Sequence, residues 1–181
     1  MIEGLEIRRM ESAEIRRRIE EFSSILVDCV QGGAGVSFML PFGQANAAAF
    51  WVSVAGECDA GKRVVIAALL DSVAVGTVQI VPVQIPNQPH RADVAKLLVH
   101  RRVRRKGVAR ALMAQVEIEA RALNRSLLTF DTTTGDAAEQ LYLSLGYVRA
   151  GIIPDYAHRP QGGLAATSVF YKLISSESAR R

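Results

Sequence analysis

Residues 92–110, ADVAKLLVHRRVRRKGVAR, constrain the fold of this chain more than any other segment. An apolar pattern typical of a strand runs into a dense basic loop, and at Gly107 the loop opens into an amphipathic helix. The helix stripe comprises Val108, Leu112, Met113, Val116, Ala120 and Leu123. This order directs free backbone N–H groups and the positive end of the helix dipole at one point. The segment therefore predicts an anion site, and the nearby arginines indicate a polyphosphorylated ligand.

The positive charge of the chain is concentrated in this loop. Residues 101–110 carry six basic side chains and no acid, whereas the whole chain has a net charge of only +4, which leaves −2 for the rest. The six are Arg101, Arg102, Arg104, Arg105, Lys106 and Arg110. A basic run by itself also fits a solvated turn or a nucleic-acid patch. Its confinement between a strand and a helix favours a small anionic ligand and no nucleic acid.

Cysteine and histidine usage gives no sign of a metal site. Cys29 and Cys58 are too few for a disulfide framework and suit a reducing, cytoplasmic location, and the three histidines lack ligand spacing. Residues 29–56 contain no charged side chain, but Pro41 and several glycines and amides interrupt them, so no membrane span is expected. The N-terminus is charged from Glu3 onward and shows no secretory pattern.

Length and composition predict one globular domain. The chain has 181 residues, of which 49% are hydrophobic and 22% charged, enough for a sizeable core. No repeat or linker divides it, so we expect a single domain over residues 1–174 and a frayed tail over residues 175–181.

Hydrophobic periodicity predicts four helices among seven strands. The helices are expected at Ser12–Gln31, Ala45–Ala55, Gly107–Leu123 and Asp136–Leu145. The strands are expected at Leu5–Arg9, Arg63–Leu70, Val73–Val83, Asp93–Val99, Leu127–Asp131, Tyr147–Ile153 and Thr167–Ile174, with a polar, Gly-rich loop at Pro154–Ala166. This order predicts an α/β (α+β) fold, a mixed and mostly antiparallel central sheet with helices on both faces.

Several of these residues resemble a known family. Residues 104–109, RRKGVA, match the Q/R-x-x-G-x-G/A signature of the GCN5-related N-acetyltransferases, the GNAT family. Asp93 lies six positions before Val99, where that family often carries an acid, and residues 138–147 resemble its A-x-x-x-Y-x-x-x-G-F helix. The likeness covers about Val73–Lys172. Residues 87–100 and 127–135 are similar to the tabtoxin-resistance type of acetyltransferase.

Two positions depart from the family pattern. Arg101 stands after His100 where many members have Pro, and Gly135 stands where many have Asn at the start of the last helix. The first affects loop stiffness. The second removes one hydrogen bond to the cofactor, which Thr133 or Thr134 could replace.

The resemblance implies acetyl-CoA as co-substrate. The amides from Arg105 to Ala109 suit a pyrophosphate, and Gly107 lets the backbone approach it closely. Arg101, Arg102 or Arg104 could reach the outer phosphate. The cofactor set is therefore Leu97, Leu98, Val99, Arg104, Arg105, Lys106, Gly107, Val108, Ala109 and Arg110. Of these, residues 97–99 would form the splayed edge of a bulged middle strand for the pantetheine, with an amide near Leu98 or Val99 polarising the thioester carbonyl.

Three side chains are candidates for the chemistry. Tyr142 would protonate the departing thiolate, although its helix position also fits a core tyrosine. Asp93 is the first candidate for accepting the proton of the amine, directly or through water, and its alternative is a salt bridge with Lys96 or Arg91. Asp131 is a candidate for the same reason, since it is an acid at the end of an apolar strand, and it could hold the ammonium group of the acceptor.

These features together predict an N-acyltransferase that moves an acetyl group to a small amine by direct attack in a ternary complex. We expect an amino-acid-like or antibiotic-like acceptor, and the second would give the protein a role in antibiotic or toxin resistance. A protein amine is the other acceptor that the sequence allows. The uncharged loop at residues 32–43 and the loop at 154–163 would frame the acceptor with an apolar wall of Phe38, Met39, Phe42 and Tyr156. The alternative is that these four side chains only pack against the rest of the protein. The alternatives are a non-catalytic CoA- or nucleotide-binding regulator and an RNA-associated module. A homodimer fits the resemblance, but no pattern marks an interface.

Overall fold

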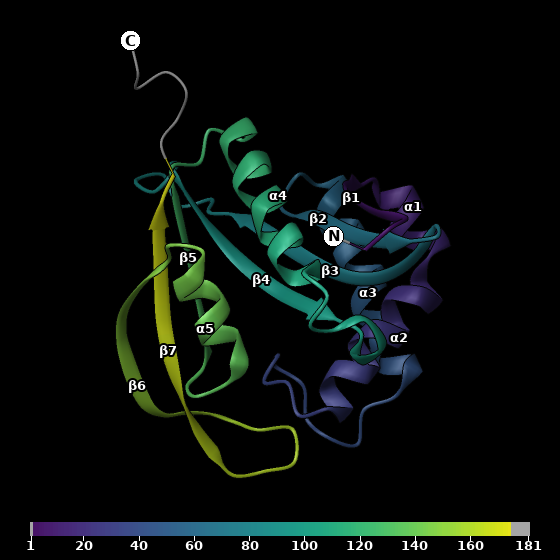
Figure 1. The fold of residues 1–181 in the computed structure, drawn as a ribbon. Coiled ribbons are helices and arrows are strands. Elements are labelled where there is room, and N and C mark those ends of the chain that lie inside the picture. The colour runs from purple at the N-terminus through teal and green to yellow at the C-terminus, as the bar shows by residue number, and fades with distance from the viewer. Residues whose placement is uncertain (1, 175–181) are drawn as a thin grey trace.

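The computed structural model describes residues 2–174 and contains a seven-stranded sheet with the strand order β1-β2-β3-β4-β5-β7-β6 (Figure 1). All neighbouring strands are antiparallel except β4 and β5. The strands are β1 (Leu5–Met10), β2 (Val64–Leu70), β3 (Val73–Pro82), β4 (Arg91–Val99), β5 (Leu127–Thr133), β6 (Val148–His158) and β7 (Leu164–Leu173). The helices are α1 (Ser12–Arg17), α2 (Ile19–Gln31), α3 (Gln44–Asp59), α4 (Val108–Ala122) and α5 (Ala137–Ser144), and Arg101–Val103 form a 3₁₀ turn. The predicted tail at residues 175–181 lies outside the described residues.

Two hydrophobic cores lie on opposite faces of the sheet. Alternate side chains of β2 divide between them: Ile66 and Ala68 pack with α4, whereas Val65 and Ala67 pack with α2 and α3. Because successive residues of a strand point to opposite faces, one apolar strand serves both cores. The predicted fold class, a mixed sheet with helices on both faces, is confirmed.

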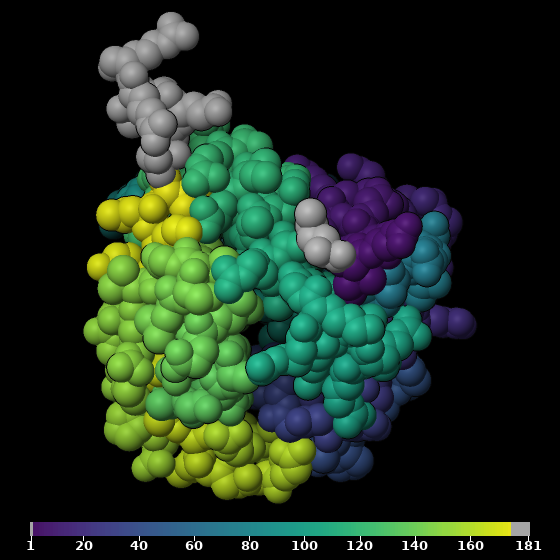
Figure 2. All heavy atoms as spheres, in the orientation of Figure 1, coloured from purple at the N-terminus to yellow at the C-terminus, as the bar shows by residue number. Residues whose placement is uncertain are grey.

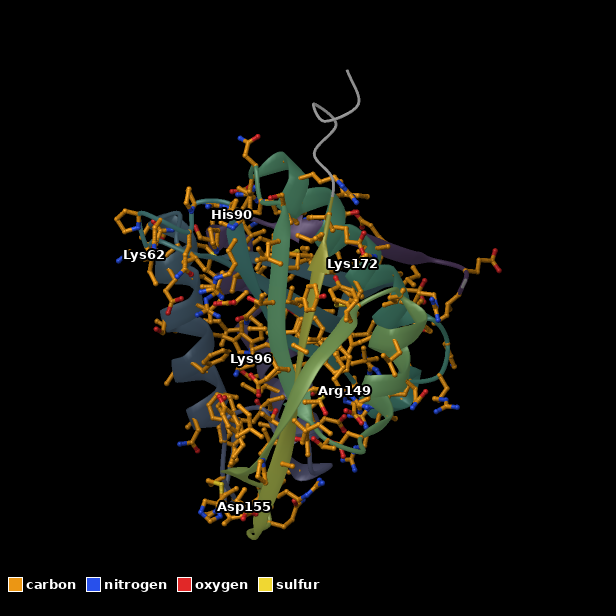
Figure 3. All side chains as sticks on the ribbon, turned by 90° about the vertical axis from the view of Figure 1, so that its left-hand side faces the viewer. Lys62, His90, Lys96, Arg149, Asp155 and Lys172 are labelled. Atoms are coloured by element: carbon orange, nitrogen blue, oxygen red, sulfur yellow. The ribbon has the colours of Figure 1, made fainter. Side chains whose placement is uncertain are left out.

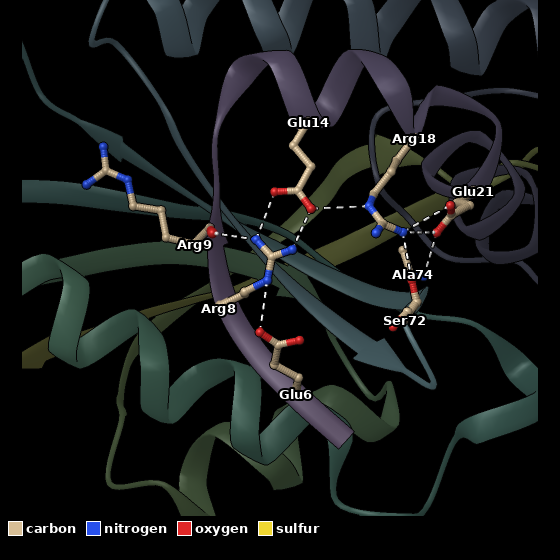
Figure 4. Close-up of polar contacts among 8 residues, drawn as sticks. All are labelled: Glu6, Arg8, Arg9, Glu14, Arg18, Glu21, Ser72 and Ala74. Atoms are coloured by element: carbon tan, nitrogen blue, oxygen red, sulfur yellow. Dashed lines mark hydrogen bonds and ion pairs between the residues drawn. The ribbon is translucent and has the colours of Figure 1, made fainter. Parts of the chain in front are cut away.

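The first predicted helix, Ser12–Gln31, is interrupted. The structure ends α1 at Arg17 and begins α2 at Ile19, with Arg18 at φ −108° and ψ 20° between them. The Arg18 guanidinium donates to the Ser72 carbonyl at 2.7 Å and pairs with Glu14 and Glu21, so these contacts tie the break to the turn before β3 (Figure 4). Apolar periodicity continues across the break and could not show it.

The predicted loop Pro154–Ala166 is mostly strand. The structure extends β6 to His158 and begins β7 at Leu164, so only residues 159–163 turn the chain. Ala157 pairs with Ala165 and His158 with Leu164, beyond a bulge that contains Asp155 at φ 48°. Figure 3 shows Asp155 at the far end of the molecule, where this hairpin projects. The glycines that suggested a loop serve the tight turn.

The strands β4 and β5 pair at only one end. Their parallel register covers residues 91–93 of β4 and 127–129 of β5, and beyond these residues the two strands diverge (Figure 1). On its other side β4 carries a bulge, because the single residue Val78 of β3 lies opposite Lys96 and Leu97. Lys96 has φ 52°, a left-handed backbone that is unusual for a residue with a side chain. The bulge and the divergence open the centre of the sheet.

Among residues 2–174, no helix has the length and the apolar character that crossing a membrane would require. The same residues contain no cluster of three or more metal-ligating side chains.

Candidate active site

A groove of about 810 Å³ lies where β4 and β5 diverge, between the loop that follows β4 and the helix α5. Figure 2 shows this hollow between the green α5 and the teal segment after β4. Its walls include the end of β4, the loop at residues 103–110, one face of α5, and residues 32–34 after α2. Arg159 and Gln161 of the β6–β7 turn also line the groove. The volume is within the usual range for a pocket that encloses a small organic molecule.

One wall of this groove presents free backbone amides. Among the described residues, none accepts a hydrogen bond from the amides of residues 105–110, and the first amide that caps α4 internally is that of Ala111, bonded to the Gly107 carbonyl at 3.0 Å. Gly107 has φ 85°, and a Cβ placed there would meet nothing within 4 Å. The backbone therefore leaves open space in front of several unpaired donors and a helix N-terminus, an arrangement that suits an anion.

The loop is held by contacts to its neighbours. The Asp28 carboxylate of α2 accepts from the Arg101 amide and the Arg101 guanidinium, both at 2.8 Å, and the Arg104 guanidinium donates to the Val99 carbonyl at 2.9 Å. Arg110 reaches across to the Ser144 hydroxyl of α5 at 2.8 Å. Of the three arginines considered for the outer phosphate, Arg101 and Arg104 thus already have internal partners, and Arg102 is exposed.

Desolvation acts to raise the pKa of Asp28, but the hydrogen bonds from Arg101 outweigh it and leave that pKa lowered. The carboxylate therefore remains charged at neutral pH and continues to bind Arg101 at the start of the basic loop.

The strand edge beside the groove is unpaired. Because β4 meets β5 only over residues 91–93, the stretch from Val94 to Val99 has no strand partner on that side. Leu97, Leu98 and Val99 all line the groove. A free strand edge can bind an extended chain through its backbone groups, which suits the amide-containing arm of pantetheine.

A second, smaller pocket of about 240 Å³ opens next to the groove. The two share four lining residues, Ala34, Leu97, Asp136 and Ala138, so they meet at the bulge of β4. The side chains that give the smaller pocket its chemistry come from three segments: Ser37 after α2, Lys96 on β4, and Asp131 on β5. We call it the acceptor pocket, because part of the loop that was expected to frame the acceptor, residues 34–37, lines it. A ligand there lies beside whatever occupies the groove at Leu97.

Tyr142 borders the acceptor pocket from α5 and is almost fully buried, with 6% of its surface exposed. Its ring contacts Phe130 at 4.4 Å between centroids and Phe170 at 5.7 Å. Burial raises the pKa of Tyr142 well above the usual value of a phenol. The phenol therefore keeps its proton at neutral pH and can act as a donor.

The two candidate carboxylates lie in different surroundings. Asp131 is exposed in the acceptor pocket, where its carboxylate accepts from the Thr167 hydroxyl at 2.7 Å. Asp93 lies at the paired end of β4, bonded to Arg91 at 2.7 Å and to the Thr129 hydroxyl, and it lines neither cavity. The structure therefore brings Tyr142 and Asp131 together and places Asp93 in the alternative partnership, the ion pair with Arg91.

The apolar wall expected around the acceptor does not form at either cavity. Phe38 and Phe42 pack on each other with tilted rings at 4.6 Å between centroids, Met39 and Tyr156 are about half exposed, and none of the four lines either cavity. The segment that lines both cavities is instead residues 32–37, the beginning of the uncharged loop.

Replacements for the missing Asn near Gly135 were expected at Thr133 or Thr134. In the structure Thr133 borders the acceptor pocket, whereas the Thr134 hydroxyl is bonded to Ser168 at 3.0 Å. Neither lines the larger groove.

Sequence reasoning missed two residues of the site. Lys96 was considered only as a partner for Asp93, and Asp28 was not considered at all. Their partners Ser37 and Arg101 are 59 and 73 residues away in the sequence. A lysine inside an otherwise apolar strand was the one available signal, because a charge there needs a partner or a cavity.

Two comparisons with known proteins agree with this geometry. The acetyltransferase (GNAT) family model matches residues 37–147, more than half of the chain. A crystal structure of an N-acetyltransferase from Staphylococcus aureus superposes with a TM-score of 0.79 at 13% identity, covering 94% of this chain and 99% of that one.

Other solved structures are similar over nearly their whole length. The acetyltransferase yncA from Salmonella typhimurium, solved with its cofactor acetyl-CoA, has a TM-score of 0.77 at 17% identity and covers 98% of both chains. A ribosomal-protein-alanine N-acetyltransferase from Brucella melitensis has a TM-score of 0.75 at 20% identity, covering 93% of this chain and 99% of that one. At these identities the structures establish a shared fold.

Proposed function

Because this chain belongs to the acetyltransferase (GNAT) family, we propose that it transfers the acetyl group of acetyl-CoA to the amine of a compact small molecule. The observation that carries this proposal is the row of unpaired amides at residues 105–110 beside an unpaired strand edge. The first suits a diphosphate and the second suits the pantetheine arm. Acetyl-CoA, when bound, supplies the acetyl group as a reactive thioester. The groove would hold this co-substrate through residues 97–99, 104–105 and 107–110, which line it, whereas the predicted Lys106 does not.

The acceptor would bind in the adjoining pocket while the co-substrate occupies the groove. The two cavities meet at Leu97, so an amine in the smaller one can approach the end of the larger one and attack directly. An amide at the bulge, near Leu98 or Val99, would donate to the acyl oxygen as negative charge develops there.

We assign proton transfer to side chains around this junction. Tyr142 would donate a proton to the departing sulfur, since its phenol is protonated at neutral pH and borders this junction. Asp131 would hold the incoming amine, and it or a water molecule would accept the amine proton. A role for Asp93 would require a chain of water molecules, because its carboxylate is bonded to Arg91 and Thr129 outside both cavities.

A compact acceptor fits better than a protein amine. The acceptor pocket has about 240 Å³, below the range usual for drug-sized ligands. Proteins with this fold include a ribosomal-protein-alanine N-acetyltransferase, so a peptide amine is the second candidate. A tabtoxin-like or antibiotic acceptor is supported by the sequence likeness of residues 87–100 and 127–135 alone.

The test is release of free thiol from acetyl-CoA in the presence of separate panels of amino acids, aminoglycosides, other small amines and N-terminal peptides. We expect saturable turnover with a small amine and stoichiometric binding of acetyl-CoA. Stoichiometric binding without thiol release for any panel member would favour a binding regulator. Binding of nucleic acid that falls steeply with salt would instead favour an RNA-associated module.

A further inference from the structure

Lys96 is a partly buried, charged side chain that forms no ion pair with any described residue. Its ammonium donates to the Ser37 hydroxyl at 3.2 Å and lies 5.6 Å from the centroid of the Phe38 ring. Among the described residues, no carboxylate forms an ion pair with it. Figure 3 shows Lys96 in the middle of the molecule, whereas Lys62 lies at its edge. Burying a cation without an ion-pair partner costs free energy, and a ligand that carries a negative charge can offset this cost.

The backbone directs this side chain into the acceptor pocket. Lys96 occupies the bulge of β4 at φ 52°, a left-handed conformation that is strained for a residue with a side chain. Strain of this kind persists where the surrounding structure holds it, often at binding sites. Both Lys96 and its partner Ser37 line the acceptor pocket.

The protein groups around Lys96 do not favour its positive charge. Burial lowers the pKa of Lys96, the positive charge of Arg63 lowers it further, and Asp131 opposes both effects. Asp131 is close enough to act on Lys96 through space but is not paired with it, and its carboxylate is bonded to the Thr167 hydroxyl. The other acid that lines this pocket, Asp136, lies 3.6 Å from the Arg159 guanidinium.

We propose that Lys96 selects an acceptor that carries a carboxylate as well as an amine, such as a free amino acid. The Lys96 ammonium and the Ser37 hydroxyl bind the carboxylate, while Asp131 on the opposite strand binds the amine. A zwitterionic ligand in a pocket of about 240 Å³ satisfies both charges at once. This inference rests on the proposed acetyltransferase function and deepens it by defining the chemical class of the acceptor.

The test compares free amino acids with their carboxamides, which keep the amine and lose the carboxylate. Thiol release from acetyl-CoA gives kcat/KM for each member of a pair, in the wild type and in Lys96→Met. We expect the wild type to prefer the acid, and Lys96→Met to lower kcat/KM for the acid by about 10- to 100-fold with little change for the carboxamide. Comparing the ratio of the two values between variants cancels the difference in amine basicity.

Three further variants sharpen the test. Lys96→Arg keeps the charge and should restore part of the preference for the acid. Asp131→Asn should weaken the acid and the carboxamide alike, because both carry the amine. Lys62→Met removes a positive charge from the surface and should change neither. Equal use of acid and carboxamide by the wild type, or an equal loss of both in Lys96→Met, would overturn the proposal.

A second measurement separates this proposal from the proposed function. If no amine releases thiol, the acetyltransferase function fails, but carboxylate recognition still predicts that free amino acids raise the melting temperature of the wild type with CoA present. Lys96→Met should show no such rise, and a cooperative thermal unfolding transition should show that this variant is folded. Absence of any rise in the wild type under those conditions would overturn carboxylate recognition as well.

Discussion

At the scale of single residues, Tyr142 shows how burial selects a chemical role. Its ring is enclosed by Phe130, Phe170 and Tyr147, with the last at 6.1 Å between centroids, yet it still borders the acceptor pocket. Because burial raises its pKa, the phenol keeps its proton and presents a hydrogen-bond donor to the pocket, and the same shift makes it a weaker acid than a free tyrosine. The same packing that makes it look like a core residue gives it this property.

Replacing Tyr142 with Phe removes the proton donor and leaves the ring packing intact. We expect kcat to fall by about 10²- to 10⁴-fold while the dissociation constant of acetyl-CoA changes little. Steady-state kinetics and calorimetric titration measure the two quantities. Tyr147→Phe is the matched control, since its buried hydroxyl has no hydrogen-bond partner among the described residues and it lines neither cavity. Unchanged turnover in Tyr142→Phe would remove the tyrosine from the mechanism.

At the scale of elements, the basic loop is positioned by a helix on the other side of the sheet. Asp28 of α2 holds both the amide and the side chain of Arg101, where the chain leaves β4. The amides of residues 105–110 are therefore oriented by a contact that lies outside the groove itself. Preorganised donors bind better than mobile ones because less order is lost on binding.

Asp28→Asn should weaken this anchor without touching the groove. We expect the dissociation constant of acetyl-CoA to rise about tenfold, equivalent to ~1.4 kcal/mol, with kcat at saturation little changed. Titration calorimetry measures the affinity. Asp59→Asn is the control, because Asp59 pairs with Arg16 at the far end of α3. Equal affinities in wild type and Asp28→Asn would show that the loop holds its shape unaided.

The packing of α4 on β3 depends on a residue without a side chain. A Cβ at Gly76 would lie 3.0 Å from the Leu98 carbonyl and 3.3 Å from both Leu112 and Val108. These neighbours belong to the bulged strand and the first turns of α4, so little can move aside. The close approach brings the helix N-terminus up to the strand end that lines the groove.

Gly76→Ala should destabilise the protein by about 1–3 kcal/mol, as overpacking does. Urea unfolding gives the free energy of unfolding directly. Gly151→Ala in β6 is the control, because a Cβ there meets nothing within 4 Å and its φ is not positive. A Gly76→Ala variant as stable as Gly151→Ala would mean that α4 can shift outward at little cost.

At the scale of the whole molecule, two buried phenols couple stability to alkaline pH. Burial raises the pKa of Tyr142, and burial with a contribution from Glu117 raises that of Tyr147. In the unfolded chain a tyrosine has a pKa near 10. Above that pH the unfolded state binds fewer protons than the folded state, so stability falls as pH rises.

The free energy of unfolding should therefore be insensitive to these groups below pH ~10 and should decrease above it. The expected slope approaches ~1.4 kcal/mol per pH unit for each tyrosine. Urea unfolding between pH 9 and pH 11 measures it. The double variant Tyr142→Phe, Tyr147→Phe should show a shallower decrease, which separates the phenols from lysines that titrate in the same range. Identical slopes in the two proteins would contradict the assignment.

Features that depend on neighbours in the sequence could be predicted without the structure. The strand, the basic loop, the glycine and the helix of residues 92–110 lie within a few residues of the expected positions, because apolar spacing and a left-handed glycine act locally. The placement of helices on both faces of the sheet followed from the order of the predicted elements. The loop that lines the groove could be singled out for the same reason, since residues 104–110 form one continuous segment.

Features that depend on distant partners were settled only by the folded chain. The break at Arg18 coincides with its hydrogen bond to the Ser72 carbonyl. Asp93 binds Arg91 and Thr129, whereas Asp131 lines the acceptor pocket. Lys96 became a binding candidate because a one-residue bulge places it at the cavity that Ser37 also lines. A strand pattern gives each side chain one of two faces, but a bulge or a contact from 59 residues away decides what that face meets.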